Sequence, residues 1–363
     1  MGKRPEGVTE YTWGARKSRK KIILISSAAV VVVAAAVAGF LFFSKGEKPP
    51  TNSTNASLGP NMTAGQYLPR KIDGVMAIVD KSNVFPVAIM IENLVSARPQ
   101  AGLGDANVVY EALAEGGITR FMAIFASGAD IKKIGPVRSA RPYYLDWAKE
   151  YGALYVHIGG SPQAIADIKA KGVFDLNQFY HSPNFYRDSA RPAPHNLYTT
   201  TRLLAFALRD LKASDTGSYD SWTFKDPENT ASLPTDQKTI EIDFSSFSYK
   251  VDYTFDREKN IYLRNQAGAP HLDADGKQIT ARNVIVQYTK TSLADSTGRL
   301  TMVTTGEGRA LFFRDGSVIQ GSWKKDQSGS RTRYVDASGN DIQLNRGTTW
   351  VEIVPDDRQV VYK

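Results

Sequence analysis

The chain has 363 residues, of which 42% are hydrophobic and 10% aromatic, so it is long enough for two domains and is not predominantly disordered. Its formal charge is +8, but residues 1–21 carry seven Lys and Arg against two Glu, so only +3 remains for the rest. Nucleic-acid binding needs clustered basic residues on the folded part, so we expect no nucleic-acid partner. The absence of cysteine excludes disulfides, thiolate metal sites, cysteine nucleophiles and a lipidated cysteine anchor.

An uncharged run from Ile22 to Phe43 predicts one transmembrane helix. As a helix, this run spans roughly 33 Å, enough to cross the cytoplasmic membrane, which is its expected partner. Basic residues precede the run (ARKSRKK), so the positive-inside rule places the tail of residues 1–21 in the cytoplasm and the main domains outside. A cleaved signal peptide is the alternative, because residues 36–38 (AVA) have the form of a cleavage site. Cleavage there would leave GFLFF exposed at the new N-terminus.

The next two segments predict a stalk and an α/β domain. Residues 44–73 are rich in Pro, Asn, Ser, Thr and Gly, which is typical of a flexible stalk. In residues 74–216, short apolar runs (FPVAIMI, FMAIFA, ALYVHI) alternate with helical segments (SARPYYLDWAKEYG, SPQAIADIKAKG, TTTRLLAFALRDLKA). In the second of these helices, Ser161 suits the N-cap, Pro162 the first turn and Gly172 the C-terminal stop.

The remainder predicts an antiparallel all-β C-terminal domain. Residues 217–239 are polar and turn-rich and mark a junction, and residues 240–363 alternate with a period of two. Tight hairpin turns are predicted at residues 275–276, 315–316 and 338–339, where Asp or Ser precedes Gly. We expect Trp323 and Trp350 in the core of this domain rather than as exposed anchors for a partner protein.

Several long motifs follow one another in a characteristic order. They are ARPQAGL, ANVVYEALAEGGITRF, IGPVRSARPYY, HIGGSP and RPAPHNLY, followed by NVIVQ, GSW-K and GTTWVEIVP. In these motifs the chain resembles the YerB-type family of bacterial envelope proteins, family 3048 of the domains of unknown function, in both its N- and C-terminal parts. The resemblance implies a bacterial, membrane-tethered, outward-facing protein and no particular activity. Many family members look like lipoproteins, whereas this chain has an apolar helix where they have a lipobox cysteine, which changes the anchor but not the side.

The stretch of residues 92–196 contains most of the candidates for chemistry, including six arginines. We expect Arg120, Arg138 and Arg141 at strand ends or turns, where three planar cations can bind a phosphate or carboxylate bidentately. The alternative is that each arginine pairs with a carboxylate and ties loops together. The carboxylates within reach are Glu92, Glu111, Glu115 and Asp146.

The motif HIGGSP predicts a strand, a glycine turn and a helix N-terminus, whose free amides favour an anion, so Gly159 and Gly160 join the ligand-binding candidates. The motif lacks a P-loop lysine and the G-x-G-x-x-G spacing, so an ordinary strand-to-helix turn is the alternative. Asn196 is a further ligand-binding candidate in the same stretch. Ser139 is expected as the N-cap of the following helix, because no G-x-S-x-G elbow surrounds it.

His157, His195 and Glu115 are the candidates for acid–base catalysis. A histidine near an apolar strand is, as an alternative, a hydrogen-bonded core residue. No metal site and no cofactor are expected, since H-E-x-x-H is absent and HLDADGK lacks the closing Glu of a calcium loop.

These residues favour binding of an anionic envelope component, such as a glycan or a lipid-linked phosphate, in an arginine-rich cleft. One alternative is an enzyme that transfers or hydrolyses a phosphate linkage. The order of arginines and glycines in this chain is loosely similar to that in the LytR-CpsA-Psr phosphotransferases. The aspartates that those enzymes place beside their arginines are absent here after Arg120 and Arg138. Another alternative is a scaffold whose β domain docks an unidentified protein.

Overall fold

The computed structural model describes residues 67–235 and 238–363. These residues belong to one compact unit, Met62–Lys363. The tail of residues 1–21, the apolar run of residues 22–43 and most of the stalk lie outside the described residues, and the expected transmembrane helix lies outside with them. Within the described ranges, no helix is long and apolar enough to cross a membrane.

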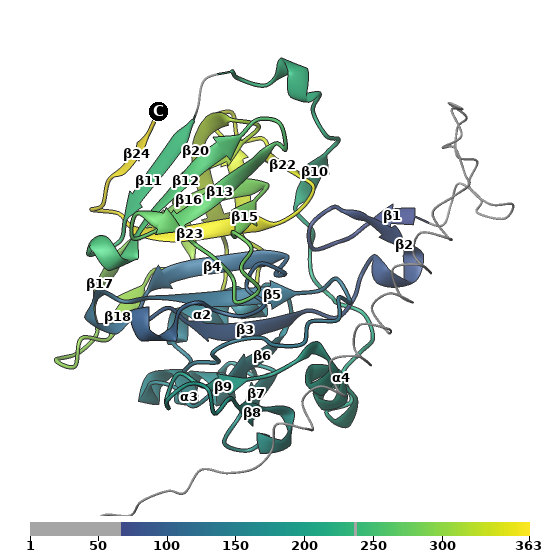
Figure 1. The fold of residues 1–363 in the computed structure, drawn as a ribbon, viewed down its shortest axis with the longest axis vertical. Coiled ribbons are helices and arrows are strands. Elements are labelled where there is room, and N and C mark those ends of the chain that lie inside the picture. The colour runs from purple at the N-terminus through teal and green to yellow at the C-terminus, as the bar shows by residue number, and fades with distance from the viewer. Residues whose placement is uncertain (1–66, 236–237) are drawn as a thin grey trace, which may run out of the picture. The chain divides into compact units, whose positions relative to one another are not determined.

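A ten-stranded sheet runs through both halves of the chain in the order β21-β20-β19-β16-β23-β4-β5-β3-β6-β7 (Figure 1). The first half supplies β3 (Val87–Glu92), β4 (Val108–Leu113), β5 (Thr119–Phe125), β6 (Leu154–His157) and β7 (Asp175–Asn177). The second half supplies β16 (Asn283–Thr289), β19 (Gly306–Arg314), β20 (Ser317–Lys325), β21 (Arg333–Asp336) and β23 (Thr349–Pro355). The halves join where β23 pairs in parallel with β4.

A second sheet, in the order β14-β13-β12-β11-β24, comes wholly from the second half. Its strands are β11 (Thr239–Asp243), β12 (Lys250–Asp256), β13 (Ile261–Gln266), β14 (Ala269–Pro270) and β24 (Val360–Tyr362), and β15 (Thr280–Ala281) also pairs with β13. Along β12, buried and half-buried residues alternate, which confirms the period of two. The remaining strands are β1 (Tyr67–Pro69), β2 (Met76–Ile78), β8 (Tyr186–Arg187), β9 (Leu197–Tyr198), β10 (Thr223–Lys225), β17 (Thr291–Leu293), β18 (Leu300–Met302) and β22 (Gln343–Asn345).

The described chain is mostly β, with α-helices only in its first half. They are α2 (Pro142–Lys149), α3 (Pro162–Ala170) and α4 (Thr201–Asp210), and each falls in a segment predicted to be helical. The Ser161 hydroxyl caps α3 by accepting a hydrogen bond from the amide of Ala164 at 3.2 Å, and Pro162 occupies the first turn, as expected. Gly172 follows the helix with a φ of +59°, in the left-handed region that ends helices.

The expectation that Ser139 caps α2 is wrong. The N-cap is Arg141, whose side chain makes no capping hydrogen bond, and Pro142 is the first helical residue. A proline at this position has no amide hydrogen that needs a partner, so the cap is less necessary.

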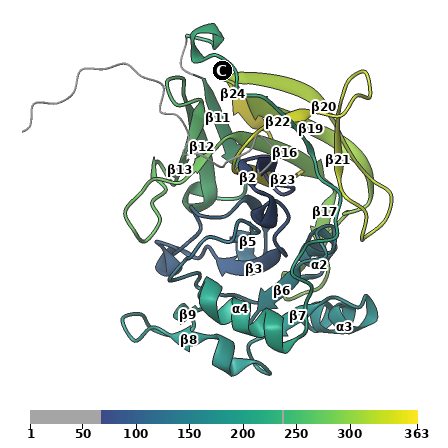
Figure 2. The same ribbon diagram turned by 90° about the vertical axis from the view of Figure 1, so that its right-hand side faces the viewer.

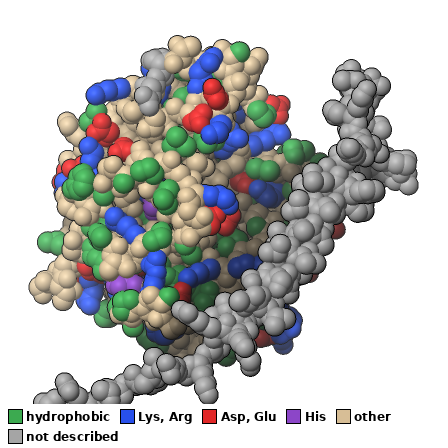
Figure 3. All heavy atoms as spheres, viewed as in Figure 1, with side chains coloured by type: hydrophobic (Ala, Val, Ile, Leu, Met, Phe, Trp, Pro, Cys, Tyr) green, Lys and Arg blue, Asp and Glu red, His purple; other side chains and the backbone are tan. Residues whose placement is uncertain are grey.

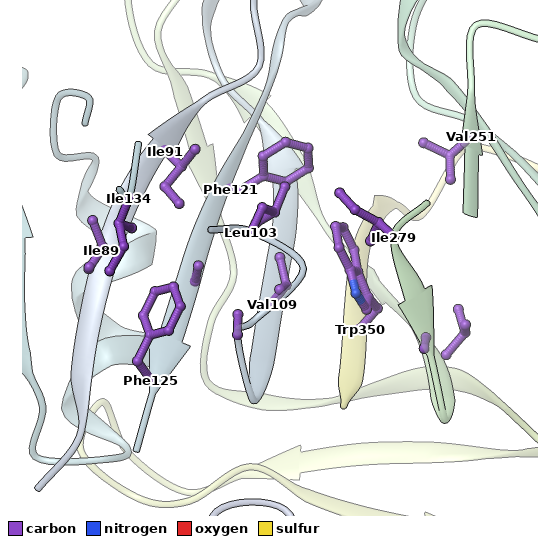
Figure 4. Packing of buried hydrophobic residues seen from close by; sticks show 14 of the residues in the cluster. Ile89, Ile91, Leu103, Val109, Phe121, Phe125, Ile134, Val251, Ile279 and Trp350 are labelled. Carbon is purple, nitrogen blue, oxygen red and sulfur yellow. The ribbon is translucent and has the colours of Figure 1, made fainter. Parts of the chain in front are cut away.

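Two apolar layers cover the two faces of the large sheet. On one face, side chains of α4 and of the second sheet pack against the strands, and Trp350 lies beside Ile279 there (Figure 4). On the opposite face, Trp147 of α2 and Ile168 of α3 join the core. Trp350 and Trp323 are 0% and 1% exposed, which confirms that both are core residues.

The antiparallel expectation for the second half is wrong for the pair of β16 and β23. β16 and β23 are parallel, from Asn283 opposite Thr349 to Thr289 opposite Pro355. The chain between them forms β17 to β22, and a connection of that length lets the second strand return in the same direction. The predicted turn at Asp315 and Gly316 is confirmed, since both have positive φ and join β19 to β20.

Candidate functional site

Five strands of the first half contribute to one edge of the large sheet. β3, β4, β6 and β7 run parallel and β5 runs antiparallel to them, so the ends of the four strands and the start of β5 share this edge. Glu92 ends β3, His157 ends β6, and Arg120 lies at the start of β5. Ligands of open α/β sheets bind beyond the carboxyl ends of the parallel strands. Figure 2 shows α4 and the β8–β9 pair close to β6 and β7.

Arg138 lies in the loop that follows β5 and forms an ion pair with Glu92. The Arg138 amide donates to the carbonyl of Met90 at 2.8 Å, which fixes this loop against β3. The Arg138 Nε lies 2.5 Å from Glu92 Oε2, and the Glu92 side chain is only 3% exposed. Burial by itself would raise the pKa of Glu92, but the charges of Arg120 and Arg138 and the amide of Leu94 outweigh it, so the pKa is lowered. Glu92 is therefore ionised at neutral pH.

Arg141 forms a bidentate ion pair with Glu115. Its Nε contacts Glu115 Oε1, and its Nη2 lies 2.6 Å from Oε2. Burial would raise the pKa of Glu115, but the hydrogen bond and charge of Arg141 together lower it. An ionised carboxylate with both oxygens engaged is a poor general base, so this geometry disfavours the catalytic role considered for Glu115.

Arg120 has no carboxylate within 4.0 Å among the described residues. Arg120 is only 4% exposed, and its Nη1 donates to the carbonyl of Ser139 at 3.1 Å. Its Nε has no hydrogen-bond partner in the described part of the chain. Burial, followed by the charge of Arg141, lowers the pKa of Arg120. The edge therefore holds a buried cation that the protein only partly compensates.

His195 lies within electrostatic reach of the pair formed by Glu92 and Arg138. It is 9% exposed, and its Nδ1 finds no partner among the residues described. Burial lowers the pKa of His195; Glu92 acts in the opposite direction, and Arg138 and Arg191 lower it further. The imidazole is therefore neutral at pH 7 and offers an unused nitrogen.

His157 is engaged on both sides of its ring. Nδ1 lies 2.6 Å from the carbonyl of Gly159, and Nε2 lies 3.2 Å from Asp175 Oδ2. The residue is 0% exposed, which agrees with the alternative of a hydrogen-bonded core histidine. Gly159 has a φ of +56°, and a Cβ at Gly160 would lie 3.1 Å from that of Ala140. Tight local packing thus accounts for the glycine turn.

Asn196 organises the loop that contains His195. Its Oδ1 accepts from Arg187 Nη1 at 2.7 Å, and its Nδ2 donates to the carbonyl of Arg191 at 3.2 Å. Arg191 in turn donates to the carbonyls of Ala97 and Pro99. The structure therefore brings Arg120, Arg138 and His195 around Glu92, whereas Asn196 supports the loop that contains His195.

A second polar cluster, which the sequence analysis did not identify, is buried between the halves. Arg264 of β13 is 0% exposed and contacts Glu111 of β4 through Nη2. Its Nε donates to the Tyr253 hydroxyl at 3.2 Å, and its guanidinium lies 4.4 Å from the ring centre of Trp350. The available signal was a charged residue inside an otherwise apolar strand, in VVYEAL, NIYLRN and WVEIVP.

Two titratable groups of this cluster are strongly perturbed. Burial, and then the charge of Glu111, raises the pKa of Glu352 well above its usual value. Burial and the charge of Arg264 lower the pKa of His271 well below its usual value. Both groups are therefore neutral at pH 7, which reduces the cost of burying them.

Metal binding receives no support from the side chains that the structure describes. Within residues 67–235 and 238–363, no group of three or more His, Asp or Glu side chains is arranged to hold a metal ion. Lys and Arg side chains are scattered among apolar and acidic ones over the face in Figure 3.

Known proteins resemble this chain in sequence and in fold. The family model described as "Protein of unknown function (DUF3048) N-terminal domain" matches residues 74–214, and the model of the C-terminal domain matches residues 240–351. A Bacillus subtilis (strain 168) protein named "Putative lipoprotein YerB" is 31% identical over 280 residues, which is 75% of this chain and 81% of that protein. The crystal structure of YerB from Bacillus subtilis matches with a TM-score of 0.73 and 28% identity, over 81% of this chain and 99% of that one. The chain therefore belongs to the YerB-like DUF3048 family and contains both of its domains.

Proposed function

We propose that the protein is a membrane-tethered, extracytoplasmic envelope protein that binds an anionic envelope component. The ligand carries a phosphate or a carboxylate, as a glycan or a lipid-linked phosphate does, and binds at the sheet edge where Arg120, Arg138 and Arg141 lie. Arg120 is the central cation of this site, and His195 contributes a neutral hydrogen-bonding nitrogen.

The position of Arg120 carries the proposal. Three guanidinium groups share two carboxylates, Glu92 and Glu115, so one positive charge is unmatched. The unmatched charge is that of Arg120, which is 4% exposed. Burial lowers the pKa of Arg120, which means that its cationic form is destabilised in the folded protein. An anion next to this guanidinium would remove that cost and form charge-assisted hydrogen bonds.

Localisation outside the cytoplasm is supported by the relative that is named a lipoprotein, since such proteins are held at a membrane surface. The apolar run of residues 22–43 would provide the anchor, with residues 1–21 inside. Protease added to cells stripped of their wall should remove the part beyond residue 44 and spare the tail. Protection of the large fragment would contradict this orientation.

Binding can be measured by calorimetry on the full-length chain with inorganic phosphate, glycerol phosphate and glucuronate as probes. We expect at least one probe to bind and to raise the melting temperature. Arg120→Met should weaken that binding at least about tenfold, because it removes the unmatched charge. Arg358→Met, at an exposed arginine in another part of the structure, is the matched control and should leave binding unchanged.

Two results would contradict the proposal. One is that none of the three probes binds, and the other is that Arg120→Met binds as tightly as the unmodified chain. A folded Arg120→Met variant is expected, because methionine fills a similar volume without burying a charge.

Phosphotransfer is the second candidate function, and the neutral His195 favours it. A neutral imidazole with an unused Nδ1 beside arginines has the chemistry of a general base at a phosphate site. Release of phosphate from a lipid pyrophosphate, lost in His195→Asn but with ligand binding retained, would identify an enzyme. Binding without turnover would identify a binding protein.

A further inference from the structure

A polar cleft lies apart from the sheet edge that holds Arg120, Arg138 and Arg141, and none of these arginines lines it. Its volume is about 630 Å³, within the range of small-ligand sites. It is lined by the turn after β1, the end of α2, residues 218–223 of the segment that joins the two family domains, and the chain around β21. Both family domains therefore contribute to its walls.

Ring contacts and hydrogen bonds hold the floor of the cleft in place. The guanidinium of Arg331 lies 3.9 Å from the ring centre of Tyr151 and 3.8 Å from that of Trp222, so it is held between two aromatic rings. Glu150, whose side chain is 0% exposed, accepts from Lys325 Nζ at 2.7 Å and from the Thr332 hydroxyl at 2.6 Å. These contacts fix the floor before any ligand arrives.

The joining segment is also fastened on both sides. The Trp222 indole donates to the carbonyl of Thr332 at 2.9 Å. The Ser221 hydroxyl donates to the carbonyl of Lys71 at 2.7 Å. The segment between the domains is therefore a wall of the cleft, and the cleft is built into the fold.

The rim presents polar side chains that the described structure does not use. Asp220 and Asp326 are exposed and have no ion-pair or hydrogen-bond partner among the described residues. Ser218 and Ser330 also leave their hydroxyls unbonded within that part of the chain. Among the residues that the structure describes, the ammonium group of Lys71 contacts only the ring of Tyr219, 5.0 Å from the ring centre. Acceptors, donors and hydroxyls thus line the same cleft.

The charge balance of the lining indicates the chemical class of the ligand. Lysines and arginines (Lys71, Lys149, Arg331, Arg333) are matched in number by acids (Glu150, Asp220, Asp326, Asp341). A polyanion or a polycation would meet equal attraction and repulsion in such a site. Hydroxyl groups donate and accept at once, so a hydroxyl-rich neutral ligand satisfies mixed donors and acceptors.

We propose that this cleft binds an uncharged segment of a glycan, of two to four sugar units. The joining segment then serves as a ligand-binding wall as well as a connection. A bound peptide is less favoured, because peptide sites use apolar pockets or a free strand edge. This lining is predominantly polar, and the outer edge of β21 already bonds to residues 340–342, through Tyr334 and Asp336. The proposal concerns a separate site and does not depend on anion binding at Arg120.

The test uses the full-length chain with three soluble probes: the tetrasaccharide of N-acetylglucosamine, the tetrasaccharide of glucose and tetra-alanine. Saturation-transfer NMR and calorimetry report binding. We expect at least one neutral tetrasaccharide to bind and tetra-alanine not to bind. The double variant Asp220→Asn, Asp326→Asn should weaken saccharide binding at least about tenfold, since hydrogen bonds to charged acceptors are lost.

The matched control is Asp243→Asn, which alters an exposed acid on β11 that does not line the cleft. It should bind the saccharide as the unmodified chain does, and all variants should keep their melting temperature because the altered acids are exposed. Absence of saccharide binding at millimolar concentration, equal binding by the double variant, or binding of tetra-alanine instead would each overturn the proposal.

Discussion

Glu111 and Glu352 lie opposite each other across the parallel pair of β4 and β23, and both side chains are 0% exposed. One guanidinium serves both carboxyl groups: Arg264 contacts Glu111 through Nη2, and its Nε lies 4.0 Å from Glu352. Burial and the charge of Glu111 raise the pKa of Glu352 well above 4.5, so Glu352 stays protonated at neutral pH. The two halves of the chain are thus joined at a buried carboxyl group that retains its proton.

Glu352→Gln should make stability less sensitive to pH. The folded-state pKa of Glu352 is above its unfolded value, so its contribution is full below about pH 4.5 and is lost as the pH rises toward the raised pKa. Glutamine needs no proton to be neutral. As the pH rises, the unfolding free energy of the variant should therefore increase relative to that of the unmodified chain, by at most about 1.4 kcal/mol per pH unit. Chemical unfolding from pH 4 to 9 measures the difference.

Glu241→Gln is the control for that series. Glu241 accepts a hydrogen bond from Lys250 on the surface, and its pKa is lowered, so its contribution is present at high pH and lost as the pH falls. That loss falls below about pH 4.5, so Glu241→Gln should show no gain in unfolding free energy as the pH rises from 5 to 9. A pH-independent difference for Glu352→Gln would mean that Glu352 is ionised in the folded protein.

Arg138→Ala should destabilise the protein by roughly 3 kcal/mol at neutral pH, because it leaves the buried carboxylate of Glu92 without its partner. The pKa of Glu92 is lowered in the folded state, so the loss should shrink as the pH falls below 4.5. The double variant Arg138→Ala, Glu92→Gln should recover part of the loss, and additive single losses would show that the pair is not coupled.

Gly321→Ala should disrupt the pairing of β20 with β21. A Cβ at this glycine would lie 2.0 Å from the carbonyl oxygen of Val335, and a backbone atom in a sheet cannot move aside easily. We expect a loss of about 2–3 kcal/mol in unfolding free energy. Gly339→Ala, at a position with open space but a φ of +84°, should cost only about 1 kcal/mol. Equal losses would show that the close approach is relieved elsewhere.

Limited proteolysis should cut the junction of residues 217–239 before it cuts inside either domain, within the exposed part of the junction at residues 226–232. The two fragments should nevertheless stay together on size exclusion, because β4 and β23 are neighbours in one sheet. Separation of the fragments would show that each family domain is stable alone. First cuts within residues 85–210 would contradict the expected boundary.

The sequence by itself determined the strands, helix ends and turns that a few neighbouring residues specify. Apolar runs of strand length predicted β3, β5 and β6, and the serine, proline and glycine around α3 marked its two ends. Local turn chemistry likewise located the Asp315 and Gly316 hairpin. The strand β4 was not predicted, although its burial is complete, because Glu111 interrupts its apolar pattern.

Tertiary structure decided which strands pair and which charges meet. The parallel β16–β23 and β23–β4 pairs join segments far apart in the chain, so no local period could predict their direction. The same pairing places Glu352 beside Glu111 and brings Arg264 to them, whereas the nearby arginines in the sequence paired with Glu92 and Glu115. Local sequence fixes backbone propensity over a few residues, but the partner of a buried charge depends on contacts that form only when the whole sheet assembles.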